Sequence, residues 1–492
     1  MQRFLLPKVR TPNQKLSFPD QKIAPHRLEL PTFSSKAIFC VLRNTRMHFG
    51  KEAMLTTPQT NWTRLDNGVR VVTEQVHDCA SAGISVLVDA GPQDETEGQI
   101  GLAHLCEHAA FLGTPLRTSQ ELALLIDAAG GCFGAFTAPD YTCFYSHVLK
   151  EYVSYALDLM GDILVASKYP EKCLEREKGV ICQEIIGYQD SPDSVLLDLT
   201  KQNLWPNDTL SNSVIGSIED VKGLTRSDVI QFVSRQYTPD RLIIAAAGGI
   251  EHDSIVEQVQ DAFWTLRGQS NPRTDLPPVV KGGIAIEEMP TAQCSFAVAL
   301  PAPAFSDKNR YTLHVMNNLI GGGMSSRLYQ TLREKHGLVY SVQSSVLSYR
   351  RGGALMITGA TTDEKLIEGI SLVLMQLMSL AVWDSPIDEE ELWKSKMQVR
   401  SQSRLATDLI SNRVSRIATQ EFHLNARIDD EKILEDIDSV TLEDLQKMAF
   451  ELLMNGMQHL SIAVTGPVKP TGSVYDELAD IYASFTGANV NE

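Results

Sequence analysis

Residues 85–91 read Ser-Val-Leu-Val-Asp-Ala-Gly, and residues 104–108 read His-Leu-Cys-Glu-His. The first segment is typical of a buried strand, and the second lies in a stretch with helical periodicity. A shift of 210 residues, without a gap, places Ser-Phe-Ala-Val-Ala-Leu-Pro at 295–301 on the first segment and His314 on His104. Internal similarity at a fixed offset indicates duplication. The second copy keeps one histidine but has Asn317 and Asn318 in place of the acid and the second histidine.

The periodicity around these segments predicts an α+β fold. An edge-type strand and a second strand are expected at 68–74 and 82–90, followed by helices at 101–111, 119–129, 151–166 and 171–188. This order is not the strict alternation of a βαβ protein. We expect two homologous domains at 60–275 and 276–485, each a mostly antiparallel sheet flanked by helices, joined by a linker rich in Pro, Gly and polar residues at 268–278.

Composition and charge exclude several classes of protein. The 492 residues are 43% hydrophobic and 21% charged, which is typical of a soluble globular protein. The longest apolar runs are too short to span a bilayer, so no membrane span is predicted. A net charge of -17 argues against nucleic-acid binding. Eight scattered cysteines without a disulfide framework indicate reduced thiols, and we expect a cytoplasmic protein.

Residues 1–59 are predicted to be a separate basic tail. The first 46 residues contain nine Lys or Arg but only two acids, Asp20 and Glu29. Five prolines in this stretch disfavour a long amphipathic helix, so we favour a disordered tail or a true start at Met47 or Met54. The alternative is a transit peptide, which would make the protein mitochondrial.

The segment 104–108 has the spacing of a catalytic zinc site. Positions i and i+4 of a helix share one face, so His104 and His108 can hold one ion while Glu107 stands beside them as general base. Zinc makes a bound water acidic and polarises a carbonyl, and a neighbouring carboxylate can accept the proton. The alternative is two unrelated histidines and a solvated acid.

A catalytic zinc needs a third protein ligand from another element, and Glu184 is the candidate. In the helix predicted after Pro170, one stripe contains two acids among mostly apolar or aromatic residues: Cys173, Glu177, Val180, Glu184 and Tyr188. We expect Glu184 to meet the cation and Glu177 to orient the site. A surface role for Glu177 stays open, because Glu175 and Lys178 beside it are expected on the surface.

With these motifs the chain resembles the pitrilysin-type (inverzincin, M16) zinc peptidases, in the half-length group of mitochondrial processing peptidases and their bacterial relatives. The resemblance runs from about Trp62 to near the end and rests on residues 104–108, the two acids of the predicted helix, Gly-Gly-Gly-Met-Ser-Ser-Arg-Leu at 321–328 and Arg-Glu-Lys-His-Gly-Leu-Val-Tyr at 333–340. It implies one Zn²⁺ per chain held by His104, His108 and Glu184, Glu107 as base, and substrate contacts from Arg333 and Tyr340.

The resemblance also implies a substrate-pairing edge strand at 134–142, with Phe136 and Thr137 as substrate-binding residues. Gly134 departs from the family, whose members usually have Asn at this position. Cys106 lies within the zinc motif, but its place between the two histidines turns it away from the ligand face, so we expect a packing thiol.

The leading hypothesis is a zinc endopeptidase that encloses extended peptides or unfolded polypeptides in a chamber, each chain forming half of a clamshell. One alternative is a non-catalytic scaffold of the same fold, which has no need for three ligands and a base. Another is a maturation protease for one precursor peptide. Because the chain carries both the zinc motif and the Arg-Tyr pair, the resemblance implies a homodimer with shared sites; pairing with a related second subunit is the alternative.

Overall fold

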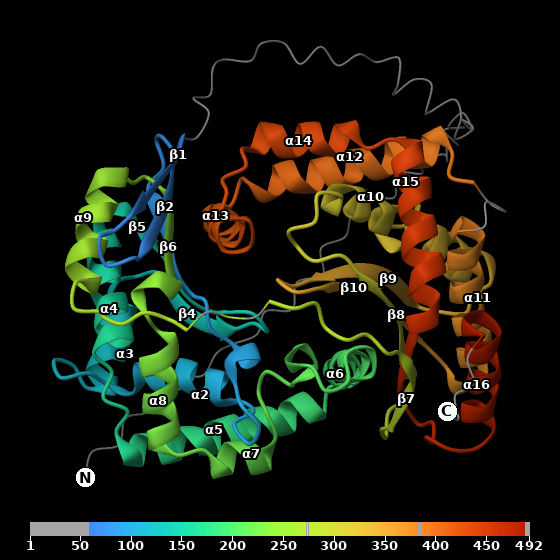
Figure 1. Ribbon diagram of the computed structural model, residues 1–492, viewed down its shortest axis with the longest axis horizontal. Helices are drawn as coiled ribbons and strands as arrows, with labels where there is room; N and C mark the ends of the chain where they lie inside the picture. Colours follow the sequence, from blue (N-terminus) through green and yellow to red (C-terminus); the bar gives the residue numbers. More distant parts are fainter. Residues whose placement is uncertain (1–58, 272, 274, 382–385, 488–492) are drawn as a thin grey trace, which may run out of the picture. The chain divides into compact units, whose positions relative to one another are not determined.

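The computed structural model describes residues 59–271, 273, 275–381 and 386–487 (Figure 1). The predicted basic tail, apart from Gln59, lies outside these residues. Each half of the described chain is built around one sheet covered by helices. The predicted α+β class is therefore confirmed.

The first sheet has six strands in the order β1-β2-β6-β3-β5-β4. Every neighbouring pair is antiparallel except β2 and β6. The strands are β1 (Gln59–Arg64), β2 (Arg70–Gln75), β3 (Ser81–Val88), β4 (Cys132–Thr137), β5 (Thr142–Leu149) and β6 (Leu242–Gly248). This order leaves β4 at one edge of the sheet, with one side free to pair with another strand.

The predicted edge position of the 68–74 strand is wrong. This segment forms β2, which lies between β1 and β6, and its central residues are buried. Glu74, the last residue of the predicted strand, is buried and forms ion pairs with Arg413 and Arg416. The strand is interior because β1 pairs with one side of it and β6 with the other. Helix α13, more than 300 residues further along the chain, covers one of its faces.

The second sheet repeats the first. Its strands are β7 (Gly283–Glu288), β8 (Cys294–Ala302), β9 (Ser341–Ser348), β10 (Gly353–Thr361) and β11 (Ser461–Gly466), in the order β7-β11-β8-β10-β9. This order matches β2-β6-β3-β5-β4, and the single parallel pair, β7 with β11, occupies the place of β2 with β6. The predicted duplication and mostly antiparallel pairing are therefore confirmed.

Helices pack on one face of each sheet and enclose its main core. In the first half these are α2 (Leu102–Ala109), α3 (Ser119–Ala128), α4 (Val153–Val165), α5 (Glu171–Gln189), α7 (Ile218–Gly223), α8 (Arg226–Gln236) and α9 (His252–Phe263). In the second half they are α10 (Arg310–Gly321), α11 (Asp363–Ala381), α12 (Glu389–Ala406), α14 (Asp430–Ser439), α15 (Leu442–Ala449) and α16 (Ser473–Thr486). The four predicted helices of the first half all form.

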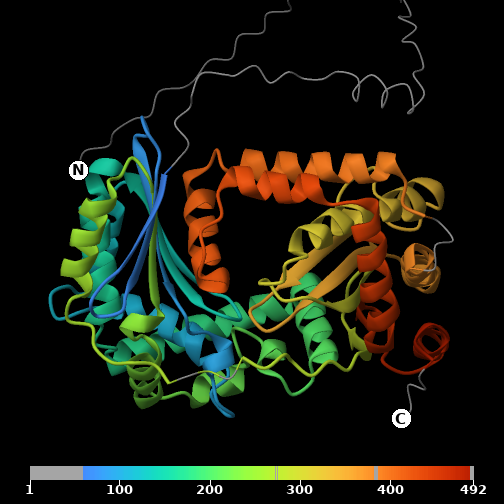
Figure 2. The same cartoon turned by 45° about the horizontal axis from the view of Figure 1, so that its top comes forward.

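The opposite face of each sheet is covered by a helix from the other half. Helix α13 (Ile410–Leu424) packs Val414, Ile417 and Phe422 against apolar residues of the first sheet. Helix α6 (Pro192–Leu204) packs Leu196 against alanines of the second sheet. Figures 1 and 2 show both helices on the sheet of the other half. The exchange buries two apolar sheet faces that would otherwise be exposed to water.

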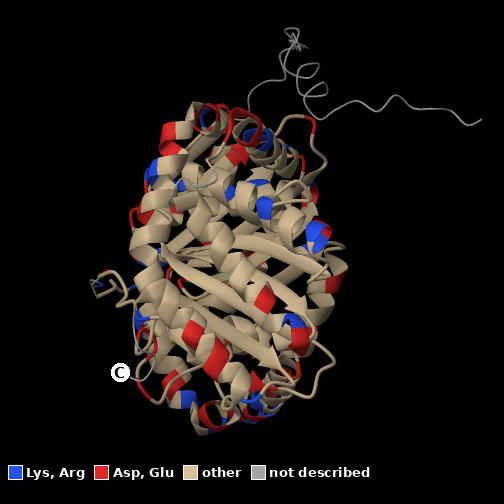
Figure 3. Ribbon diagram, turned by 90° about the vertical axis from the view of Figure 1, so that its right-hand side faces the viewer, with Lys and Arg blue, Asp and Glu red and all other residues tan. Residues whose placement is uncertain are grey.

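Lys and Arg residues are interspersed with Asp and Glu on the side of the molecule drawn in Figure 3. Of the described helices, none combines the length and apolarity required to cross a membrane. All cysteines among the described residues are free thiols.

Candidate metal centre

Helix α2 carries His104, Glu107 and His108 and is held at its start by Glu95. The helix begins after Gly101, whose φ of 86° lies in the left-handed region, where glycine carries no Cβ penalty. The two carboxylate oxygens of buried Glu95 accept hydrogen bonds from the backbone amides of Gly101 (3.1 Å) and Ala103 (2.8 Å). Burial raises the pKa of Glu95 to about 8, while the two amides lower it.

His104, His108 and Glu184 form a compact group of three potential metal ligands. All three ligand atoms lie within 4.8 Å of one another. The Nε2 atoms of His104 and His108 lie 3.8 and 3.6 Å from Oε2 of Glu184. Two ligand atoms on a tetrahedral zinc ion are separated by roughly 3.3 Å, from metal–ligand distances of about 2.0–2.2 Å. The spacing of the group is therefore close to what a single ion requires.

The state of His104 also fits a metal ligand. Burial, and to a smaller extent His108, lowers its pKa to about 4, so its imidazole is neutral near pH 7. A neutral ring nitrogen has the lone pair that zinc needs. The Nδ1 atom of His104 is buried and has no hydrogen-bond partner among the described residues. The donor set of two imidazoles and one carboxylate is a known catalytic zinc set that leaves one position open.

Glu177 lies behind His108. Its Oε1 atom is 3.0 Å from Nδ1 of His108, on the side of the ring away from Glu184. A carboxylate in this position fixes the ring orientation and the tautomer with a proton on Nδ1, which leaves Nε2 free for a metal.

Glu107 lies next to the ligand group on α2, and its carboxylate accepts a hydrogen bond from strand β4. The hydroxyl of Thr137, the last residue of β4, donates to Oε2 of Glu107 at 2.6 Å. Burial raises the pKa of Glu107, and the hydrogen bond from Thr137 acts in the opposite direction. The resemblance assigned Thr137 only to substrate binding; its contact with Glu107 could not be read from the sequence.

The predicted inward stripe of α5 is partly wrong. Val180 is exposed, and the buried residues of the helix are Leu174, Lys178, Ile181, Cys182 and Ile185. Lys178, expected on the surface, is buried because its ammonium group donates to the carbonyl oxygens of Lys222 (3.0 Å) and Leu224 (2.9 Å) and pairs with Glu175. Glu184 is about half exposed, at 49% of its side chain, and faces the histidines from the margin of the buried face.

Strand β4 presents two different faces. Phe133 and Ala135 pack toward the main core, with Thr137 on the same side, whereas Phe136 points to the opposite face and contacts the rings of Tyr141 and Tyr145. Gly134 lies under Tyr145, because a Cβ there would lie 2.5 Å from the tyrosine hydroxyl. The residue that departs from the family pattern is therefore the one that lets Tyr145 lie across the strand.

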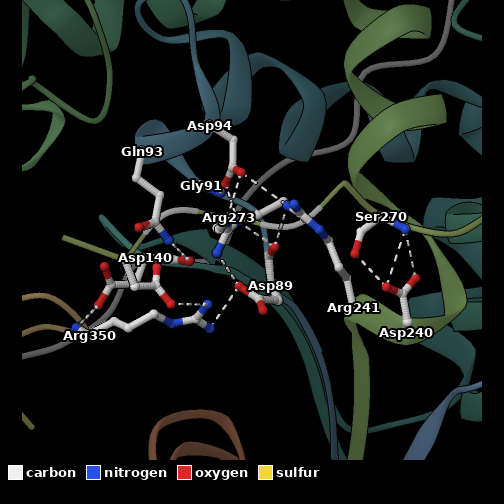
Figure 4. Close-up of polar contacts among 12 residues, drawn as sticks. Asp89, Gly91, Gln93, Asp94, Asp140, Asp240, Arg241, Ser270, Arg273 and Arg350 are labelled. Atoms are coloured by element: carbon white, nitrogen blue, oxygen red, sulfur yellow. Dashed lines mark hydrogen bonds and ion pairs between the residues drawn. The ribbon is translucent and has the colours of Figure 1, made fainter.

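The turn that ends β4 is held by an ion-pair network that sequence reasoning missed (Figure 4). Arg273 of the linker pairs with Asp89 and Asp94, and Arg350 of the second half pairs with Asp89 at 2.9 Å. The backbone amide of Arg350 donates to Oδ2 of Asp140, in the β4–β5 turn, at 2.8 Å. Burial raises the pKa of Asp140 to about 6 against the influence of these cations.

Arg333 and Tyr340 lie together in the second half of the chain. Arg333 lies on a π-helical segment (Tyr329–Lys335). Its guanidinium carbon is 5.3 Å from the centroid of the Tyr340 ring and 4.9 Å from that of the Tyr329 ring. Tyr340 is 77% exposed. Within the described part of the chain, no hydrogen bond, ion pair or ring contact joins either residue to His104, His108 or Glu184.

Cys106 is buried in the main core of the first half, and burial raises its pKa well above the usual range. It is therefore a packing thiol, as its position in the motif predicted. The triglycine at 321–323 closes α10 in close contact with its surroundings: a Cβ on Gly321 would lie 2.6 Å from the backbone nitrogen of Ser344. Gly321 is thus required for close packing, a role that the sequence had not indicated.

The fold and this centre define a duplicated α+β protein with a candidate His-His-Glu metal site and an adjacent carboxylate. The description "Insulinase (Peptidase family M16)" matches residues 70–217, and "Peptidase M16 inactive domain" matches residues 223–399. An uncharacterized zinc protease of Mycobacterium leprae is 33% identical over 410 residues, covering 82% of this chain and 91% of that protein. The chain belongs to peptidase family M16.

Two solved structures share the fold. The peptidase M16 inactive domain from Pseudomonas fluorescens has a TM-score of 0.76 at 19% identity, covering 84% of this chain and 100% of that chain. A chain of complex III2 from Candida albicans has a TM-score of 0.74 at 16% identity, covering 86% and 100%. At these identities the likeness concerns the fold alone.

Proposed function

We propose that this protein is a zinc-dependent endopeptidase that hydrolyses peptide bonds of extended peptides or unfolded polypeptides. The observation that carries the proposal is the convergence of His104, His108 and Glu184 within 4.8 Å, with Glu107 on the same helix as the histidines. The zinc-protease name of the Mycobacterium leprae relative supports the same metal and reaction. In this proposal residues 60–275 form the catalytic domain, and residues 276–485 form its inactive homologue.

The residues of this chain have separate roles in the proposed reaction. His104, His108 and Glu184 hold the ion, and Glu177 keeps Nε2 of His108 directed toward it. Zinc, when bound, supplies Lewis acidity that polarises the peptide carbonyl and makes water more acidic. Glu107 accepts the proton of the attacking water and returns it to the leaving amine, while Thr137 fixes the position of its carboxylate.

Strand β4 supplies the binding surface for the peptide backbone. It is the edge of the first sheet, and its last residue, Thr137, contacts Glu107. An extended peptide that adds to this edge satisfies its main-chain hydrogen bonds whatever its sequence. This mode suits unfolded polypeptides and brings the peptide to the metal centre. Enclosure of the substrate in a chamber is the further element that the resemblance implies.

We further propose that Arg333 and Tyr340 serve the metal centre of a second copy of the chain. Tyr340 is exposed, and among the described residues no hydrogen bond, ion pair or ring contact joins either side chain to the centre of its own chain, which leaves both available to a partner. The protein then functions as a homodimer with two equivalent sites, because each chain carries both sets of residues.

The deciding experiment combines metal analysis with peptide cleavage. The purified protein is expected to contain about one zinc per chain and to cleave a mixed peptide library. Glu107→Gln should retain the zinc but lose turnover, because it removes the base and leaves the ligands in place. Full activity of Glu107→Gln would refute the mechanism. Zinc binding without cleavage of any peptide by the wild-type protein would favour a scaffold instead.

A further inference from the structure

A cavity of about 400 Å³ lies between the first sheet and α13. Its walls include Phe136 of β4 and Tyr145 of β5, with Asn412, Ser415 and Thr419 contributed by α13. Because successive side chains of a strand point to opposite faces, this cavity is on the other side of β4 from Thr137 and its contact Glu107. The cavity is therefore separate from the metal centre but borders the same edge strand.

Tyr145 extends this cavity toward the open edge of the sheet. Tyr145 is directly opposite Gly134 in the antiparallel pair, and a Cβ on Gly134 would lie 2.5 Å from its hydroxyl and 2.6 Å from its Cζ atom. The ring therefore lies across β4 in the space that any larger residue at 134 would occupy. Phe136 and Tyr145 stay exposed, at 44% and 36%, with their ring centroids 6.2 Å apart.

The apolar surface at this edge matches one kind of occupant. A peptide added to β4 directs every second side chain toward α2 and the metal, and the side chains between them toward α13. The latter side chains meet two aromatic rings and a cavity large enough for a large apolar group. Among the described residues that line this cavity there is no Lys, Arg, Asp or Glu. A charged side chain placed there would lose water without gaining an ion pair.

We propose that Tyr145 and Phe136, together with α13, form a side-chain subsite that selects an aromatic or large aliphatic residue of the bound peptide. The inference rests on the proposed peptidase function and specifies its substrates: peptides with a bulky apolar residue at a position that points away from the metal helix. Gly134 is part of this subsite, because only glycine leaves room for the Tyr145 ring.

Tyr145 also has a purely structural explanation. An aromatic ring that covers a glycine on a neighbouring strand stabilises a sheet. Loss of that stabilisation would lower the melting temperature and reduce activity toward all peptides alike. A subsite, in contrast, changes the relative kcat/KM among peptides that differ at one position.

The test uses the full-length, zinc-loaded protein and peptides of one sequence in which Phe, Leu, Ala or Lys replaces a single residue at each position in turn. Cleavage sites are assigned by mass spectrometry. The variants are Tyr145→Ala, which removes the ring, and Ser415→Trp, which fills the cavity from α13 without altering the sheet. The control is Leu149→Ala, since Leu149 is exposed on β5 and does not line the cavity.

The wild-type protein is expected to prefer Phe or Leu over Ala by about 10-fold or more in kcat/KM at one alternate position, from the burial of an apolar side chain. Tyr145→Ala and Ser415→Trp should reduce this preference to about 2-fold or less, and Leu149→Ala should retain it. Equal cleavage of all peptides by the wild-type protein, or a preference that survives in both variants, would overturn the subsite while leaving the peptidase intact. If the wild-type protein cleaves no peptide, both proposals fail.

Discussion

Oε1 of Glu177 lies 3.0 Å from Nδ1 of His108 and holds the ring with Nε2 toward Glu184. Glu177→Gln is expected to weaken zinc binding about 10- to 100-fold, because the amide orients the imidazole less well and makes it less basic. The measurement is zinc retention against a competing chelator. Glu171→Gln, on the exposed first turn of the same helix, is the control and should bind zinc as the wild type does. Unchanged affinity in Glu177→Gln would return this acid to a surface role.

Glu95 supports α2, the helix that carries His104 and His108, because its carboxyl group accepts hydrogen bonds from the backbone amides of Gly101 and Ala103. Glu95→Ala should lower the free energy of unfolding by about 1–3 kcal/mol, because two buried amides at the start of α2 lose their acceptor. Zinc affinity should fall with it, since His104 lies in the first turn of this helix. Urea unfolding and chelator competition measure the two effects. A variant with wild-type stability would show that water or another group replaces the carboxylate.

Asp140 gives a prediction for the dependence of stability on pH. Burial raises its pKa from 3.8 to about 6. Its favourable contribution to the free energy of unfolding is therefore complete below about pH 4 and is lost as the pH rises through about 6. Asp140→Asn keeps an acceptor for the Arg350 amide and carries no charge. Relative to wild type, it should be equally stable at pH 4 and more stable by about 2–3 kcal/mol at pH 8.

The check on Asp140 is a series of urea unfolding curves between pH 4 and pH 8. Asp261→Asn, an exposed substitution on α9, should run parallel to the wild type over the whole range. If Asp140→Asn is less stable than the wild type at pH 8, the ionised carboxylate is stabilised by Arg350 and Arg273 more than burial opposes it.

The shared-site homodimer is tested by mixing two inactive variants. Glu107→Gln lacks the base. Tyr340→Phe lacks the hydroxyl that we propose donates a hydrogen bond to the developing oxyanion, and losing one such donor typically lowers the rate about 10²–10³-fold. After dissociation and reassociation together, the mixture should regain activity, because one site of each mixed dimer then combines two intact contributions. Mixed dimers detected by light scattering that stay as inactive as their components would rule out shared sites.

Local sequence patterns predicted the helices that carry the candidate site, and the repeat at 210 residues predicted the second sheet. They failed where distant segments decide burial. The edge position assigned to the 68–74 strand was wrong because β1 pairs with its outer side. Its Glu74 is buried because α13, far along the chain, covers it with Arg413 and Arg416. Lys178 was misplaced because the carbonyl groups that compensate its burial come from α7 and the residue after it.

The details of the site that depend on pairing between strands were also beyond the sequence. Thr137 was selected by resemblance to a family, but its hydrogen bond to Glu107 depends on where β4 ends relative to α2. Gly134 looked like the loss of a polar contact. Its pairing with Tyr145 across the sheet gives it a steric reason instead.

The reciprocal placement of α6 and α13 has the geometry of a domain swap within one chain. Each half gives a helix to the sheet of the other, as two identical subunits do when they exchange an element. A duplicated gene that encoded such a swapped dimer would yield this arrangement directly once a linker joined the two copies. Either half produced alone would expose the sheet face that its twin normally covers. Two fragments divided within the linker should therefore assemble when they are co-expressed.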